Sequence, residues 1–204
     1  MNRKLLGLLG AVAALVIGFA IYQTTVPVPL NGGVIEPPLP MPDFTLESVD
    51  GPVKLSDFRG KYVVLFFGFT NCPDVCPLTM AGLRQAVTDL GDRAGQVQVL
   101  FVSVDHRRDT PETVAGYTTS FRPDFIGLTG SKEQIDQVTG NFGIYYKLGE
   151  PQEGGEHAHG EESYDVEHTT TVQVLDREGN LILTWAHDTP PDKLASDLKV
   201  LIAR

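Results

Sequence analysis

The sequence predicts an α/β fold in which helices cover both faces of a mixed β-sheet. Two uninterrupted apolar runs, residues 62–67 (YVVLFF) and 97–104 (VQVLFVSV), are typical of strands that are buried on both faces. A segment with helical periodicity lies between them, and turn residues near the end of the chain indicate an antiparallel hairpin. Strands that first alternate with helices and then close with a hairpin favour a three-layer arrangement.

The first half of this domain is expected to contain a hairpin, a strand, a helix and a second strand. Residues 44–46 and 53–55 flank Asp50-Gly51-Pro52, whose turn-forming residues predict the hairpin. After the strand 62–67, a helix is expected from near Pro77 to Gly91. Leu83, Val87 and Leu90 recur there at helical spacing. The strand 97–104 follows.

The second half is expected to contain two helices, the closing hairpin and a last helix. Thr110-Pro111-Glu112 has the cap and first-turn proline of a helix start, and another helix is expected over residues 132–139. Residues 170–175 and 180–185 bracket the turn Asp176-Arg177-Glu178-Gly179. Asp188-Thr189-Pro190 opens the last helix, which carries Leu194, Leu198 and Leu201.

Length and charge limit the classes of function. A chain of 204 residues is expected to form one domain with appendages. Its net charge of −10 argues against nucleic-acid binding, since phosphate contacts need a basic face. The acidic residues concentrate in residues 150–167, which hold seven carboxylates and no Lys or Arg.

The N-terminus is expected to anchor the chain in a membrane. Arg3-Lys4 precedes 18 uncharged residues, 5–22, which as a helix would span about 27 Å, close to the hydrocarbon thickness of a bilayer. An uncleaved anchor (residues 1–25) is favoured over a cleaved signal. The positive flank would stay in the cytoplasm, so the chain is expected to be a single-pass protein of a bacterial inner membrane, with its C-terminal domain in the periplasm.

The anchor is followed by a proline-rich segment. Six of the 17 residues 26–42 are proline, which predicts a stiff, extended spacer rather than folded structure. The folded domain is then expected over residues 43–204.

Both cysteines lie in one short stretch, GFTNCPDVCP. Cys72 and Cys76 are four positions apart, so a disulfide between them would close a very short loop and stabilise the fold little. Cys72 follows a strand and Cys76 lies near a helix start, where backbone N–H groups favour a thiolate. One helical turn would bring both sulfurs to the same face, and two thiolates suit a soft ion such as Cu(I). From the residues alone, a redox couple and a metal site both stay open.

Three motifs together resemble the Sco/SenC family: GFTNCPDVCP at 68–77, SVDHRRDTP at 103–111 and YDVEHTT at 164–170. Members of this family are membrane-anchored copper proteins with a thioredoxin-like fold, and they help to metallate the dinuclear copper centre of cytochrome c oxidase. The resemblance implies a copper site, for Cu(I) or Cu(II), formed by Cys72, Cys76 and His168. In a thioredoxin fold, the loop that carries His168 would enter the strand 170–175 beside the cysteine loop.

Other residues are secondary candidates. Asp105 matches the family's SVD motif and is a candidate second-shell residue, or else a turn-forming aspartate. His106 stands where the family usually has proline, and it is interpreted as a solvated substitution rather than an accessory ligand. His157 and His159, among carboxylates, could hold a metal weakly at the surface, although a flexible acidic loop is the simpler interpretation.

The favoured function is a copper metallochaperone that delivers copper to subunit II of cytochrome c oxidase, rather than an enzyme. The alternative is a thiol-disulfide reductase in which Cys72 and Cys76 cycle to keep the copper-site cysteines of the oxidase reduced. Another copper chaperone and a thioredoxin-like reductant are the further partners to expect. A peroxidase is disfavoured because the threonine lies two rather than three positions before Cys72. A plain tethered interaction domain would leave the paired cysteines unexplained.

Overall fold

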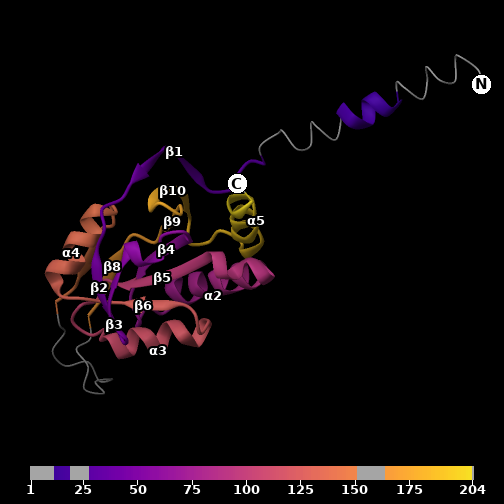
Figure 1. Cartoon of the computed structure of the whole chain (residues 1–204). Helices are drawn as coiled ribbons and strands as arrows, with labels where there is room; N and C mark the ends of the chain where they lie inside the picture. Colours follow the sequence, from indigo (N-terminus) through magenta and orange to yellow (C-terminus); the bar gives the residue numbers. More distant parts are fainter. Residues whose placement is uncertain (1–11, 19–27, 151–163, 204) are drawn as a thin grey trace, which may run out of the picture.

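The computed structural model describes residues 12–18, 28–150 and 164–203 (Figure 1). Its centre is a six-stranded sheet in the order β1-β10-β9-β4-β5-β6. The bounds of these strands are β1 Gly33–Pro40, β4 Tyr62–Gly68, β5 Val97–Ser103, β6 Ile126–Leu128, β9 Val172–Leu175 and β10 Asn180–Trp185. β4, β5 and β6 run parallel, whereas β9 is antiparallel to both β4 and β10, and β10 is antiparallel to β1. The predicted mixed sheet is therefore confirmed.

Two layers cover the sheet. Helices α2 (Val75–Thr88) and α5 (Pro191–Ile202) pack on one face, where Val114 of α3 (Pro111–Phe121) joins the same core. Helix α4 (Lys132–Asn141) covers the other face together with the hairpin of β2 (Thr45–Ser48) and β3 (Gly51–Lys54). Alternate residues of β4 enter the two cores, Val64 and Phe66 on one side, Val63 and Leu65 on the other. This double burial is why the strand is apolar at every position.

Most of the expected elements form close to their expected bounds. The hairpin around Asp50 forms, and the one at 176–179 joins β9 to β10. The side chain of Thr110 caps α3 by accepting the backbone N–H of Thr113. Helix α2 begins at Val75, earlier than expected, and so includes Cys76; Pro77 is tolerated there because the first turn of a helix has no partners for its N–H groups. Two short 3₁₀ helices, η1 (Leu55–Phe58) and η2 (Gly91–Gln96), complete this part of the fold.

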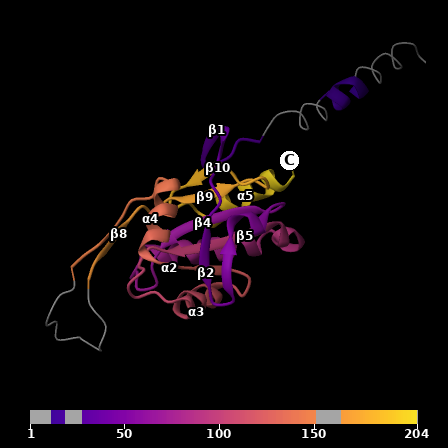
Figure 2. The ribbon, with the colours of Figure 1, turned by 60° about the vertical axis from the view of Figure 1, so that its left-hand side comes forward.

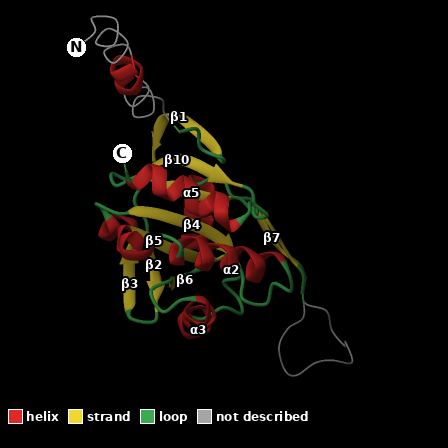
Figure 3. Ribbon diagram, turned by 90° about the vertical axis from the view of Figure 1, so that its right-hand side faces the viewer, coloured by secondary structure: helices red, strands yellow, loops and turns green. Residues whose placement is uncertain are grey.

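Three short strands lie in segments that show no clear hydrophobic period. These are β6 and the pair β7 (Tyr146–Leu148) and β8 (Val166–His168). β7 and β8 form an antiparallel arm that stands away from the central sheet, as Figures 2 and 3 show. His168 is the last residue of β8, at the base of this arm, so it belongs to a strand of its own rather than to a loop before β9.

The proline-rich segment differs from the expected spacer. Its residues Gly33–Pro40 form β1, which pairs with β10 at the edge of the sheet. An edge strand tolerates proline because one side of its backbone faces no partner. Asp197 of α5 adds a second tie, since its carboxylate accepts the backbone N–H groups of Asn31 and Gly32.

The described part of the chain contains no helix that is long and apolar enough to span a membrane. Of the expected anchor, residues 12–18 are described, and they are helical. The anchor stays a prediction.

Candidate metal centre

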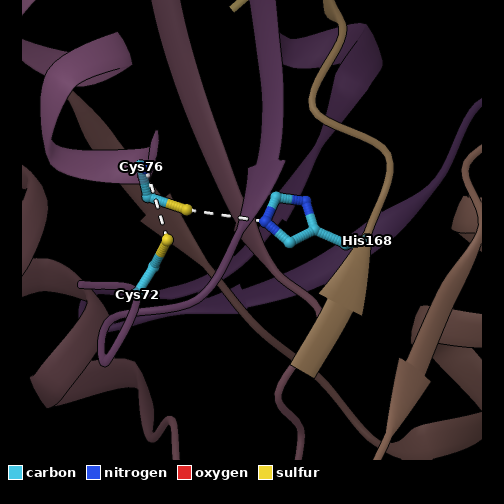
Figure 4. Close-up of side chains that lie close together, drawn as sticks. All are labelled: Cys72, Cys76 and His168. Carbon is cyan, nitrogen blue, oxygen red and sulfur yellow. Dashed lines mark hydrogen bonds between the residues drawn. The ribbon is translucent and has the colours of Figure 1, made fainter. Parts of the chain in front are cut away.

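The cysteine loop is a tight turn between β4 and α2. The backbone N–H of Cys72 donates to the carbonyl of Phe69 (3.3 Å), which closes the turn directly after the strand. The backbone N–H of Cys76, in the first turn of α2, donates to Sγ of Cys72 (3.3 Å). Both cysteines are free thiols; Cys72 is half-buried and Cys76 is buried. The local fold therefore brings the two sulfurs together (Figure 4), and Cys72 is the more accessible of the two cysteines.

His168 reaches the same point from the base of the β7–β8 arm. Its Nε2 lies 3.6 Å from Sγ of Cys76 (Figure 4). Its Nδ1 lies 2.9 Å from the carbonyl oxygen of Thr169, and a carbonyl can only accept, so the proton of the neutral ring is on Nδ1. Nε2 then keeps its lone pair on the side of the cysteines. A backbone partner that fixes the tautomer in this way is usual for metal-binding histidines.

Three ligand atoms, one each from Cys72, Cys76 and His168, lie within 4.8 Å of one another. Burial raises the pKa of the Cys76 thiol well above its ordinary value, and the hydrogen bond with Cys72 adds to this shift. Burial also lowers the pKa of His168. In the metal-free protein at neutral pH the imidazole is therefore neutral and ready to bind, whereas a metal must displace the proton of Cys76.

A groove opens beside the three side chains. It has a volume of about 380 Å³ and is lined by Phe69, Cys72, Pro73, Asp74, Val75, Val166, Glu167, His168 and Thr170. Because Cys72 and His168 both line it, a partner that enters the groove can reach two of the three ligand atoms directly.

Of the secondary candidates, Asp105 and His106 lie in the described part of the chain. Asp105 is fully buried, and its carboxylate accepts hydrogen bonds from Arg108 and Tyr164. No hydrogen bond found in the described residues joins Asp105 to the cysteines or to His168. His106 lies beside Tyr146, with ring centroids 6.5 Å apart, and is not a member of the group of three residues that could hold a metal. His157 and His159 fall outside the described residues.

Asp109 is a further candidate that the sequence motifs did not single out. Its carboxylate accepts the backbone N–H of Thr70 (2.9 Å) and the Thr70 hydroxyl (2.5 Å), two residues before Cys72. The available signal was positional: Asp109 lies in the segment after β5, and the C-terminal ends of the parallel strands β4 and β5 meet at the same edge of the sheet. A carboxylate in that segment is well placed to contact the cysteine loop.

Comparison with known proteins is consistent with this geometry. A sequence model described as SCO1/SenC matches residues 35–203. A mitochondrial SCO2 homologue from Bos taurus is 41% identical over 140 residues, which cover 67% of this chain and 50% of the relative. The chain likewise spans about half the length of the mitochondrial SCO1 homologue from Homo sapiens.

Solved structures show the same fold. The solution structure of apo Sco1 from Thermus thermophilus superposes with a TM-score of 0.74 at 40% identity, covering 85% of this chain and 97% of that one. The crystal structure of Arabidopsis thaliana ScoI with copper bound superposes with a TM-score of 0.70 at 31% identity, covering 80% of this chain and 99% of that one. A homologue thus carries copper, and the Cys72, Cys76 and His168 group here could hold a metal. The match over residues 35–203 establishes that the chain belongs to the SCO1/SenC family.

Proposed function

We propose that this protein is a copper metallochaperone that binds copper through Cys72, Cys76 and His168 and delivers it to subunit II of cytochrome c oxidase. The observation that carries the proposal is the approach of the three ligand atoms to within 4.8 Å of one another. Family membership supports copper as the metal and cytochrome c oxidase as the recipient, since Sco proteins act in copper handling for cytochrome c oxidase assembly.

The chemistry of the three ligands suits copper. Two thiolates and one imidazole are soft to intermediate donors, a set that favours Cu(I) and also accommodates Cu(II). Uptake needs both thiols reduced and releases the proton held by Cys76, whose pKa is raised by burial. Delivery would proceed by ligand exchange in the groove. The recipient's ligands would first replace Cys72 and His168, and the buried Cys76 thiolate would dissociate from copper last.

The test is a copper titration of the reduced domain, wild type against His168→Ala, with metal content and X-ray absorption recorded. We expect about one equivalent of bound copper with sulfur scattering in the wild type, and weaker binding without the nitrogen ligand in the variant. A His168→Ala variant that binds and delivers copper like the wild type would rule out the three-ligand site.

A thiol-disulfide reductase is the second candidate, and one observation favours it. Cys72 is half-buried and lines the groove, whereas Cys76 is buried behind it. Cys72 could attack a partner disulfide to form a mixed disulfide, which Cys76 would resolve. The partner would gain two electrons and two protons and this chain would be left oxidised, so a thioredoxin-like reductant would be needed for turnover. Disulfide reduction by the metal-free domain that Cys72→Ser abolishes and His168→Ala spares would favour this activity.

We also propose where the protein acts. The uncharged run of residues 5–22 after Arg3-Lys4 supports a single-pass anchor in a bacterial inner membrane, with the copper domain in the periplasm. Such a tether would keep the domain near a membrane-bound oxidase and near another chaperone that supplies copper. Protease protection in spheroplasts tests this topology, since the domain should be digested from the periplasmic side only.

A further inference from the structure

One short turn, residues 105–109, contacts both halves of the metal centre. It follows β5 and is closed by two hydrogen bonds. The backbone N–H groups of Asp109 (3.0 Å) and Arg108 (3.3 Å) both donate to the backbone carbonyl of Asp105. The two aspartates at its ends are both buried. Neither touches a ligand atom through a hydrogen bond in the described residues, yet each binds a segment that carries one.

The Asp109 end holds the cysteine side. The Asp109 carboxylate accepts the N–H and the hydroxyl of Thr70, at 2.9 and 2.5 Å, and also the hydroxyl of Ser103. Thr70 lies inside the turn that the Cys72 N–H closes on Phe69. Asp109 is 6% exposed, so these bonds compete little with water. The start of the cysteine loop is thus fixed to the end of β5 by a buried charged acceptor.

The Asp105 end holds the histidine side. Its carboxylate accepts Nε of Arg108 (2.5 Å) and the hydroxyl of Tyr164, which lies four residues before His168. The Arg108 guanidinium lies 3.8 Å above the ring of Tyr164 and also donates to the Tyr164 carbonyl (3.4 Å). These contacts fix the chain as it enters β8, the strand that ends at His168.

We infer that the turn 105–109 is a bracket that sets the position of the two cysteines relative to His168, with Asp109 and Asp105 as positioning residues. The inference rests on the proposed copper site and adds what holds its halves in register. The β7–β8 arm pairs with itself rather than with the central sheet, so its register with the cysteine loop has to come from other contacts. Outer residues that orient metal ligands typically change metal affinity 10- to 100-fold when replaced.

The two ends of the bracket predict different signatures. Asp109→Ala and Thr70→Val loosen the cysteine side, so each should weaken Cu(I) binding about tenfold. Each should also hold the two thiols together less firmly, which lowers their effective concentration relative to each other and so disfavours the disulfide. A tenfold lower effective concentration makes the Cys72/Cys76 reduction potential about 30 mV less negative. Tyr164→Phe loosens the histidine side only, so it should weaken Cu(I) binding and leave the potential unchanged. Thr70→Ser keeps the hydroxyl and should behave like the wild type.

The experiment measures Cu(I) affinity by competition with a chromophoric chelator, and the metal-free reduction potential in glutathione buffers. The control is Asp176→Ala, which removes an aspartate that accepts the N–H groups of Glu178 and Asn180 in the distant β9–β10 hairpin. It should lower stability and change neither quantity. Thr70→Val keeps the test decisive if Asp109→Ala fails to fold.

Two results would overturn the bracket. One is an unchanged reduction potential in both Asp109→Ala and Thr70→Val. The other is a Tyr164→Phe variant that binds Cu(I) as tightly as the wild type. A wild-type protein that takes up no copper would instead overturn the proposed function, and the potentials would still decide whether Asp109 holds the cysteines.

Discussion

Gly68, the last residue of β4, leaves no room for a side chain behind the candidate metal centre. A Cβ added there would lie 2.8 Å from Sγ of Cys76 and 2.8 Å from Cε2 of Phe101, whereas normal contacts are about 3.5–4.0 Å. Both neighbours are fully buried, so one must move by roughly 1 Å. Overpacking of this kind costs about 1–3 kcal/mol, and we expect Gly68→Ala to lower the free energy of unfolding by about 2 kcal/mol.

The same displacement should weaken copper binding. Metal–ligand distances tolerate only about 0.2 Å, so a shift of roughly 1 Å at Sγ of Cys76 should reduce affinity at least about tenfold. Urea unfolding and Cu(I) competition measure the two effects. Gly127→Ala is the matched control, because its Cβ would lie 2.6 Å from the carbonyl of Val114, and it should lose stability without losing affinity. A Gly68→Ala protein with wild-type affinity would refute the reasoning.

Three further predictions test the fold and the site. Gly82→Ala should stabilise the domain by about 0.5–1 kcal/mol in urea unfolding, because the added Cβ in α2 would come no nearer than 3.8 Å to Pro191 and a helix favours Ala over Gly. Asp197→Ala should lower the free energy of unfolding by about 3 kcal/mol, measured by Trp185 fluorescence during urea unfolding. The buried indole N–H of Trp185 would lose its acceptor at 2.9 Å, and residues 31–32 would lose the carboxylate that accepts their N–H groups. A loss below about 1 kcal/mol would contradict this. The lowered pKa of His168 means that the unfolded chain, with a pKa of about 6.5, binds the proton more readily, so stability should fall as pH falls from about 6.5 towards the folded pKa. His168→Asn should reduce that slope and leave the part that comes from His106, whose pKa is also lowered by burial, and an NMR titration in which His168 protonates above pH 6.5 would contradict the shift.

The sequence predicted the parts of the fold that depend on local pattern. The apolar run in β4 reflects burial on both faces, and the turn residues at 50–52 and 176–179 specify their hairpins through backbone preferences. β7 and β8 gave no such signal, because three-residue strands in a projecting arm bury too little to impose a period. The prolines of β1 predict a spacer because they argue against a strand, and only the place of β1 at the sheet edge makes them acceptable.

The residues of the candidate site were also within reach of the sequence. Cys72 and Cys76 are local in the chain, and their spacing and the helix after them suffice to bring the two sulfurs together. His168 was assigned through the family resemblance, and its distance of 3.6 Å from Cys76 depends on the β7–β8 arm, which no local pattern describes. The partners of Asp105 and Asp109 could not be predicted, since each aspartate binds a segment that is distant in sequence.

The sequence by itself determined most of the helices and strands and the candidate donor residues of this protein, because periodicity, turn residues and side-chain type are properties of single segments. The tertiary structure decided which carboxylate serves which half of the site. Asp105 turns to Tyr164 and the histidine arm, and Asp109 turns to Thr70 and the cysteine loop. The physical reason is that two parallel strands end at one edge of the sheet, so segments far apart in the chain share buried polar groups that only the folded state can satisfy.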